Sequence, residues 1–171
     1  TGIITFLNGY SSHAGLEKGA SYFFLAYAVV SLILRFVLGK LQDRRGDNII
    51  IYSSLIFFIA GLAVLASASA DWQIIAAGAL VGIGCGSILP AGQAIAVRLV
   101  PMHEMGAGIS TFFLLLDVGI GFGPILLGQV ISATGYSAMY WLLAGLMLVA
   151  SVVYFFVHGR KDIARGDVRY E

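Results

Sequence analysis

Long apolar segments alternate with short polar links along the whole chain. The apolar segments occupy residues 1–10, 20–38, 49–68, 72–99, 106–132 and 139–157. A helix needs roughly 20 predominantly apolar residues to cross the hydrocarbon core of a membrane. The last five segments meet this requirement, so the pattern predicts five complete transmembrane helices. The first segment is too short to cross, and we interpret it as part of a membrane helix that is truncated at its start.

The links between these segments are short and contain turn-forming residues. They read SSHAGLEKG, QDRRGD, SASAD, VPMHE and ATGYSA, with the glycine, serine and proline typical of turns. Links of this length force consecutive helices to run antiparallel as neighbours. The sequence therefore predicts an all-α membrane bundle with no separate soluble domain.

The composition supports a membrane protein and excludes other classes. The 171 residues are 59% hydrophobic and 11% charged, whereas soluble domains carry roughly 25% charged residues. A soluble fold of this size could not bury so much apolar surface. The net charge of +1 does not create the positive electrostatic potential that would attract nucleic acid.

No pattern in the sequence indicates a metal, a cofactor or an enzyme. The single cysteine, Cys85, lies in an apolar segment and can form no internal disulfide. The sequence contains no metal-binding spacing of Cys and His and no phosphate-binding loop. No nucleophile, base and orienting acid are expected to converge. His13, His103 and His158 fall in links or at segment ends, so we expect them to be exposed to solvent.

The distribution of basic residues predicts the orientation. If the link after residue 10 is external, nine of the 10 lysines and arginines lie on the cytoplasmic side or one turn from it, and only Lys18 is external. This excess satisfies the positive-inside rule. We therefore expect a multi-pass protein of the plasma membrane, with the loop 39–48 and the tail 158–171 in the cytoplasm.

The densest run of charge lies between the second and third apolar segments. Residues 39–46 read GKLQDRRG, a G-x-L-x-D-R-x-G pattern that follows Arg35 by one turn. This pattern resembles the signature loop between the second and third helices of each half of major facilitator superfamily transporters. The family usually continues with two basic residues. This chain has Asp47 and Asn48 there, which suggests a helix N-cap.

The resemblance implies a gating role for this loop. Its glycines allow a tight turn, and Asp43 can accept hydrogen bonds from arginines such as Arg98. Such a contact holds in one conformation and breaks in the other, as a rocking transporter requires. An ordinary solvated turn is the alternative. The expected gating residues are Gly39, Asp43, Arg44, Gly46 and Arg98.

The resemblance extends along the chain. Residues 108–142 look like the eleventh helix and the start of the twelfth in bacterial drug:proton antiporters of the superfamily, and residues 80–101 look like the tenth. On this alignment the chain is the C-terminal six-helix half, from the middle of the seventh helix. The resemblance implies an N-terminal six-helix half as partner. It also implies alternating access, a small-molecule substrate and protons, without a cofactor.

Small residues indicate helix-packing faces. Three glycines recur every four residues in the segment 72–99, and this spacing lets helices approach closely in lipid. The GIGFGP stretch at 119–124 is similar to the antiporter motif that is better known from the family's fifth helix. The expected packing residues are Gly78, Gly82, Gly86, Gly119, Gly123 and Pro124.

Polar residues inside apolar segments are candidates for substrate contact. In the family the seventh and tenth helices line the central cavity, which implies Thr5, Asn8 and Gln93 as cavity residues. Tyr27 is a further candidate. Hydrogen bonding between helices is the alternative role for these residues.

Asp117 is the one acidic residue deep within an apolar segment. Helical spacing places Ser110, Gly121 and Pro124 on the same face. An acid at this depth costs roughly 2.5–3.5 kcal/mol on insertion scales. Because a buried carboxyl can exchange protons near neutral pH, Asp117 is our candidate for proton coupling. A packing role satisfied by neighbouring polar groups is the alternative.

These observations predict half of a secondary active transporter. We expect proton-coupled efflux of small hydrophobic or amphipathic compounds, because the expected cavity has little charge. One alternative is a transporter of a polar metabolite, such as a sugar, an amino-acid derivative or a metallophore. The other is a membrane interaction protein that does not transport.

Overall fold

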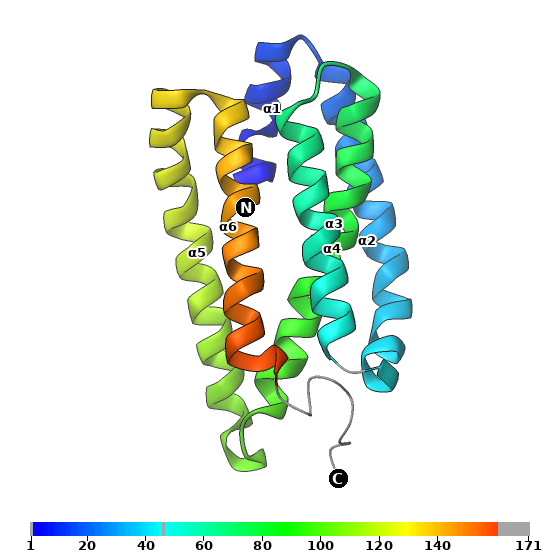
Figure 1. The fold of residues 1–171 in the computed structure, drawn as a ribbon, viewed down its shortest axis with the longest axis vertical. Coiled ribbons are helices and arrows are strands. Elements are labelled where there is room, and N and C mark those ends of the chain that lie inside the picture. Colours follow the sequence, from blue (N-terminus) through cyan, green and yellow to red (C-terminus); the bar gives the residue numbers. More distant parts are fainter. Residues whose placement is uncertain (1, 46, 161–171) are drawn as a thin grey trace.

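The computed structural model describes residues 2–45 and 47–160, with the side chains of residues 35–45 outside that description. The described chain is helical throughout, without strands (Figure 1). The elements are α1 (Gly2–Ala14), α2 (Glu17–Arg45), α3 (Asp47–Ala66), α4 (Asp71–Arg98), the 3-10 turn η1 (Met102–Glu104), α5 (Met105–Thr134), α6 (Tyr136–Tyr154) and the π-helical turn η2 (Phe155–Gly159). The predicted all-α half-bundle is confirmed.

Five of the described helices, α2 to α6, are long and apolar enough to cross a membrane. Helix α2 continues through Arg45, beyond the expected end of its span at residue 38. The expected loop residues 39–45 therefore form its last turns. Lysine, leucine, glutamine and arginine are good helix formers, and a helix can continue once its polar side chains have left the hydrocarbon.

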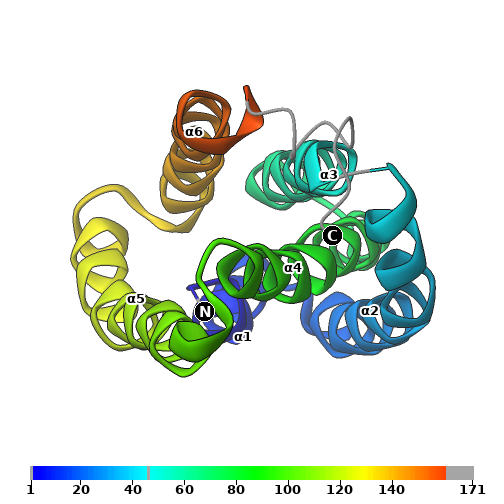
Figure 2. The same cartoon turned by 90° about the horizontal axis from the view of Figure 1, so that it is seen from below.

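Consecutive helices run antiparallel, so the links gather at two ends of the bundle (Figure 1). We call the end where α3 begins and α4 and α6 finish the Asp47 end. Figure 2 shows α3 and α6 on one side of the bundle and α2, α4 and α5 on the other. Helix α4 packs most extensively on α2 and α3, and α3 also packs on α6. Helix α5 is the least covered, with only Leu127 buried.

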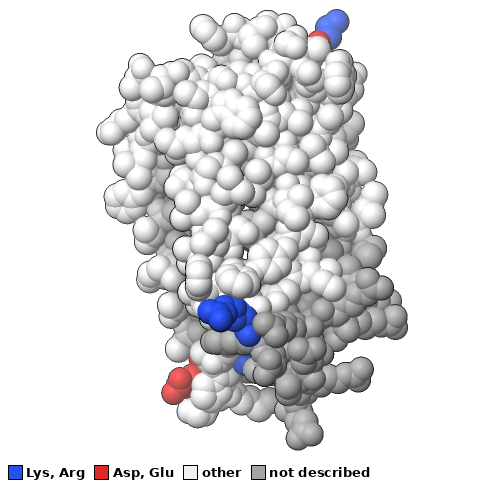
Figure 3. All heavy atoms as spheres, viewed as in Figure 1, with Lys and Arg blue, Asp and Glu red and all other residues white. Residues whose placement is uncertain are grey.

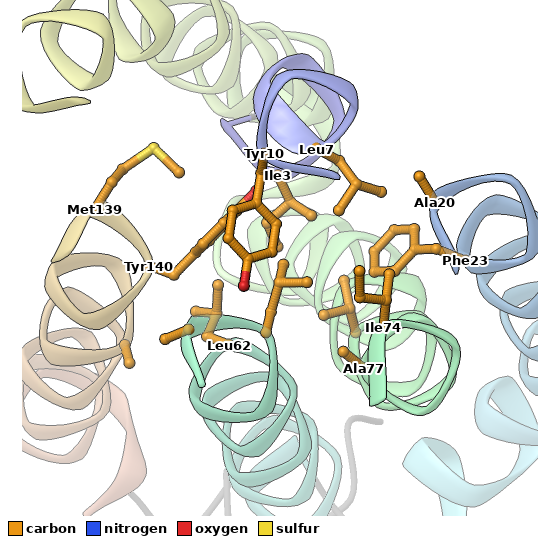
Figure 4. Packing of buried hydrophobic residues seen from close by; sticks show 14 of the residues in the cluster. Ile3, Leu7, Tyr10, Ala20, Phe23, Leu62, Ile74, Ala77, Met139 and Tyr140 are labelled. Carbon is orange, nitrogen blue, oxygen red and sulfur yellow. The ribbon is translucent and has the colours of Figure 1, made fainter. Parts of the chain in front are cut away.

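The larger hydrophobic core cluster lies between α1, α2, α3, α4 and α6 (Figure 4). Helix α1 contributes Ile3, Leu7 and Tyr10, whose spacing of three to four residues places them on one buried face. The Tyr10 ring meets the Tyr140 ring edge-on with centroids 5.3 Å apart. The Tyr10 hydroxyl donates to the Ala68 carbonyl at 3.2 Å, so the short α1 helix is tied to the α3–α4 link.

Glycines bring α4 close to α2. A Cβ at Gly78 would lie 2.7 Å from the Phe23 carbonyl oxygen, and one at Gly82 would lie 2.9 Å from that of Tyr27. The Ser31 hydroxyl donates to the Gly82 carbonyl at 3.1 Å across this contact. The absence of a side chain thus allows backbone-to-backbone packing, the arrangement favoured between helices in lipid.

The charged side chains that Figure 3 shows lie at the two ends of the bundle, with an uncharged band between them. Such a band is what the lipid-facing side of a membrane bundle requires.

Candidate functional site

A pocket of about 230 Å³ lies between α2 and α4. It is lined by Tyr27, Ala28, Ser31, Leu32, Cys85, Gly86 and Leu89. Its walls are largely apolar, with the Tyr27 and Ser31 side chains supplying the hydroxyls. The Ser31 hydroxyl is already engaged with the Gly82 carbonyl. The pocket therefore suits a mostly apolar group.

Of the four predicted substrate-contact residues, Tyr27 lines this pocket and the other three do not. Thr5 and Asn8 are exposed on α1, and Gln93 is half-buried on α4. The Tyr27 ring stacks on the Phe23 ring, with centroids 6.4 Å apart. The structure therefore does not gather the four candidates into this one pocket, and their contact with substrate stays a prediction.

Asp117 lies on an exposed face of α5. Within the described chain its carboxylate makes no hydrogen bond or ion pair. It lines an open groove together with Ser110, Phe113 and Gly121. The small, polar face predicted from helical spacing is therefore directed away from the rest of this half-bundle.

The predicted packing glycines fall into two groups. Gly78, Gly82 and Gly86 lie against α2. In contrast, a Cβ at Gly119 or Gly123 would have no described atom within 4 Å. For the GIGFGP stretch, Pro124 included, packing against a segment beyond the described residues stays a prediction.

The predicted gating loop is described only in part. Gly46 and the side chains of Asp43 and Arg44 lie outside the described residues, and Gly39 is described only as part of the α2 backbone. Arg98 is described, and its guanidinium lies 3.2 Å from Oδ1 of Asp47. The contact between Arg98 and Asp43 therefore stays a prediction, while Asp47 is an observed partner that the sequence analysis did not consider.

Asp47 is the buried centre of a polar cluster. Its side chain is 1% exposed, and Oδ2 lies 3.2 Å from Nε2 of His158. The neighbouring Asn48 donates to the Gly159 carbonyl at 2.8 Å and accepts from the Tyr154 hydroxyl at 3.1 Å. We call Asp47, Asn48, Arg98, Tyr154 and His158 the Asp47 cluster. It joins the ends of α3, α4 and α6.

The expectation that His158 is exposed is wrong, since it is 5% exposed, whereas His13 and His103 are exposed as expected. The π-helical turn Phe155–Gly159 changes the helical register and directs His158 inward. A Cβ at Gly159 would lie 2.7 Å from the Tyr52 hydroxyl, so glycine permits this close approach. The sequence offered one signal for this cluster: Asn48 and His158 are polar residues that directly flank two apolar segments.

Antiparallel helices of this length and apolarity are those of a multi-pass membrane protein. The chain matches the family model of the Major Facilitator Superfamily over residues 2–168, and it belongs to that superfamily.

Curated relatives are similar at low identity. The MFS-type efflux transporter ffsH of Aspergillus flavipes is 28% identical over 132 residues, 75% of this chain and 23% of that protein. The MFS efflux transporter aclA of Aspergillus oryzae is 24% identical over 159 residues, 88% of this chain and 28% of that protein. The uncharacterized MFS-type transporter YhhS of Escherichia coli K12 is 30% identical over 130 residues, which are 73% of this chain and 32% of that protein. The chain thus spans between a fifth and about a third of the length of these relatives.

Proposed function

We propose that this chain forms one half of a secondary active transporter that exports small hydrophobic or amphipathic compounds in exchange for protons. Membership of the superfamily supports transport in general. Two relatives that carry the word efflux in their names support the direction. The match of this chain to only part of each relative supports a further half as its partner.

The observation that carries the proposal is the position of Asp117. Its carboxylate is exposed on a face of α5 that the rest of the described chain leaves uncovered. An ionisable group within a membrane helix is costly and usually faces a bundle interior or a water-filled cavity. We infer that this face borders the space between the two halves, where a carboxylate can take up and release protons as access alternates.

The pocket between α2 and α4 supports an apolar or amphipathic substrate. Its lining contains the side chains of Tyr27 and Ser31, of which the Ser31 hydroxyl is bonded to the Gly82 carbonyl, and no described charge. A polar metabolite would leave many of its hydrogen-bonding groups unpaired there, and an unpaired buried polar group is unfavourable. The wall of this pocket therefore favours lipophilic cargo over a sugar or an amino-acid derivative.

Substitution of Asp117 tests the coupling. In the reconstituted full-length protein, Asp117→Asn keeps the shape of the side chain but removes its ability to gain and lose a proton. We expect transport driven by a pH gradient to be lost, while counterflow of substrate survives. Ser110→Ala, on the same face, is the matched control and should retain both activities. Gradient-driven transport that persists in Asp117→Asn would show that another residue carries the proton.

A further inference from the structure

A proline inside α4 leaves one backbone carbonyl without its helical donor. Pro90 lies within the helix Asp71–Arg98. In a regular α-helix each N–H donates to the carbonyl four positions earlier, and proline has no N–H. The carbonyl four positions before Pro90 belongs to Gly86. It therefore loses the donor that a regular helix supplies, and it can accept a hydrogen bond from another group.

The Gly86 carbonyl belongs to the wall of the pocket between α2 and α4. Gly86 and Leu89 both line that pocket. A helix carbonyl is directed along the axis toward the C-terminus, so it lies beside the residues three and four positions further on, here Leu89 and Pro90. Gly86 has no side chain of its own that could screen the carbonyl. The pocket wall thus contains a backbone acceptor.

The side-chain hydroxyls of the pocket do not oppose this preference for a donor. The Ser31 hydroxyl gives its proton to the Gly82 carbonyl at 3.1 Å, so its oxygen retains only the capacity to accept. That oxygen lies close to Gly86, since a Cβ placed there would be 2.9 Å from Ser31 Oγ. The Tyr27 hydroxyl can both donate and accept, so it favours neither kind of ligand. Two acceptors therefore lie on the same part of the lining.

The size and charge of the pocket limit what it can bind. Its volume is about 230 Å³, and a cavity of about 150 Å³ already holds benzene, so a bicyclic aromatic group fits. Ala28, Leu32, Cys85 and Leu89 supply most of the remaining wall. No charged side chain of the described residues lines the pocket, so an ammonium group would lack an opposite charge there, which is costly. The donor that suits the pocket is a neutral one.

We propose that this pocket binds an apolar compound that carries a neutral hydroxyl or N–H group, which donates to the Gly86 carbonyl and the Ser31 oxygen. The inference rests on the proposed exporter function, and it narrows the cargo from amphipathic compounds in general to those with such a donor. A compound of the same shape whose polar group can only accept leaves both oxygens unpaired and binds more weakly. Pro90 then determines specificity through the carbonyl that it leaves free.

Two probes test this selectivity in the purified full-length protein. The compounds 1-naphthol and 1-methoxynaphthalene share a ring system and an oxygen, but only 1-naphthol can donate. We expect its Kd to be about 3- to 10-fold lower, the effect of one hydrogen bond, by equilibrium dialysis at a fixed detergent concentration. Ala28→Leu, which fills the pocket, should weaken the binding of both probes. Equal Kd values in the wild type would overturn the proposal, as would probe binding that Ala28→Leu leaves unchanged.

Substitution of Pro90 tests the source of the preference. Pro90→Ala returns an N–H to the Gly86 carbonyl, so the ratio of the two Kd values should fall to less than about 2. Pro124→Ala is the matched control, because Pro124 is a proline inside α5 and frees the carbonyl of Ile120, which does not line this pocket. It should retain the wild-type ratio. A wild-type ratio in Pro90→Ala would exclude the Gly86 carbonyl as the acceptor.

A second measurement needs no variant. Glycine labelled with ¹³C at the carbonyl and serine labelled with ¹⁵N select the peptide bond between Gly86 and Ser87, the one Gly-Ser pair in this chain. In the wild type, 1-naphthol should shift the NMR signal of that carbonyl, and 1-methoxynaphthalene should leave it nearly unchanged. An equal response to both probes would overturn the proposal. Neither measurement involves protons or transport, so failure here leaves the Asp117 test of the exporter function untouched.

Discussion

At the residue scale, the Asp47 carboxylate joins two bases from distant parts of the chain. Arg98 lies 51 positions away and His158 lies 111 positions away. Taking a carboxylate out of water is costly unless opposite charge and hydrogen bonds compensate. Both oxygens of Asp47 have such a partner, which accounts for the presence of a charged group that is 1% exposed.

Removal of the Arg98 guanidinium should destabilise the protein. Arg98→Met keeps much of the side-chain volume but leaves a buried carboxylate with less compensation. We expect a loss of about 2 kcal/mol in the free energy of unfolding, measured by denaturant titration in detergent. Glu104→Gln removes an exposed charge whose side chain is 59% exposed, and it should change stability by less than about 1 kcal/mol. Equal effects of the two substitutions would argue against a structural role for the Asp47 cluster.

The cluster shows what sequence reasoning could and could not predict at this scale. The charged character of residues 39–48 and the importance of Arg98 were visible in the sequence. The contact between His158 and Asp47 was not visible, because His158 belongs to the turn η2, which departs from regular α-helical geometry. A pattern of period 3.6 contains no signal for such a local change of register.

At the element scale, α4 organises the bundle. It lies between α2 and α3 and packs extensively on both. Its glycines face α2, while Gly84 faces α3, where a Cβ would lie 2.5 Å from the Phe58 Cβ. Two opposite sides of one helix are therefore free of side chains where its neighbours cross it.

Filling the α2–α4 contact should weaken the bundle. In Gly82→Ala the new Cβ would lie 2.9 Å from the Tyr27 carbonyl oxygen, and backbone can move away only if the helices separate. We expect a loss of about 1–3 kcal/mol in the free energy of unfolding. Gly145→Ala, on α6 with no described atom within 4 Å, should be neutral or slightly stabilising because alanine favours helix. Gly82→Ala with wild-type stability would exclude close packing at this contact.

Helix existence was more predictable than helix ends. Apolar runs of sufficient length marked α2 to α6, since lipid demands hydrogen-bonded helices wherever the chain crosses it. The ends of a helix depend on local helix propensity and on the solvation of side chains beyond the hydrocarbon. Neither produces a sharp change in the sequence at residue 38, so the continuation of α2 to Arg45 was not predicted.

At the scale of the whole molecule, several helices of the described bundle expose large apolar side chains. Helix α5 exposes Phe113, Leu114, Leu115, Phe122, Ile125 and Leu126, and helix α2 exposes Leu25, Val29, Leu32 and Ile33. The sequence predicted that the Asp117 face would point into a bundle or toward another half. Within the described chain no other helix packs on that face, and Asp117 lines an open groove.

This chain by itself is therefore expected not to transport. In proteoliposomes containing only the 171 residues, we expect no substrate uptake above that of empty vesicles, because the Asp117 groove is lined by α5 alone and is open on its other side. Joint reconstitution with the remainder of the full-length protein should restore uptake. Robust transport by the chain alone would contradict both the half-bundle interpretation and the proposed role of Asp117.

The length of α6 determines where the Asp47 cluster sits in a membrane. Its 19 residues rise about 28 Å at 1.5 Å per residue, close to the roughly 30 Å of a hydrocarbon core. The π-helical turn with His158 follows at once, so the cluster is expected at the level of the lipid headgroups. The partly exposed guanidinium of Arg98 is then at the depth of the lipid phosphates, and a membrane that contains anionic lipids offers it a further partner beside Asp47.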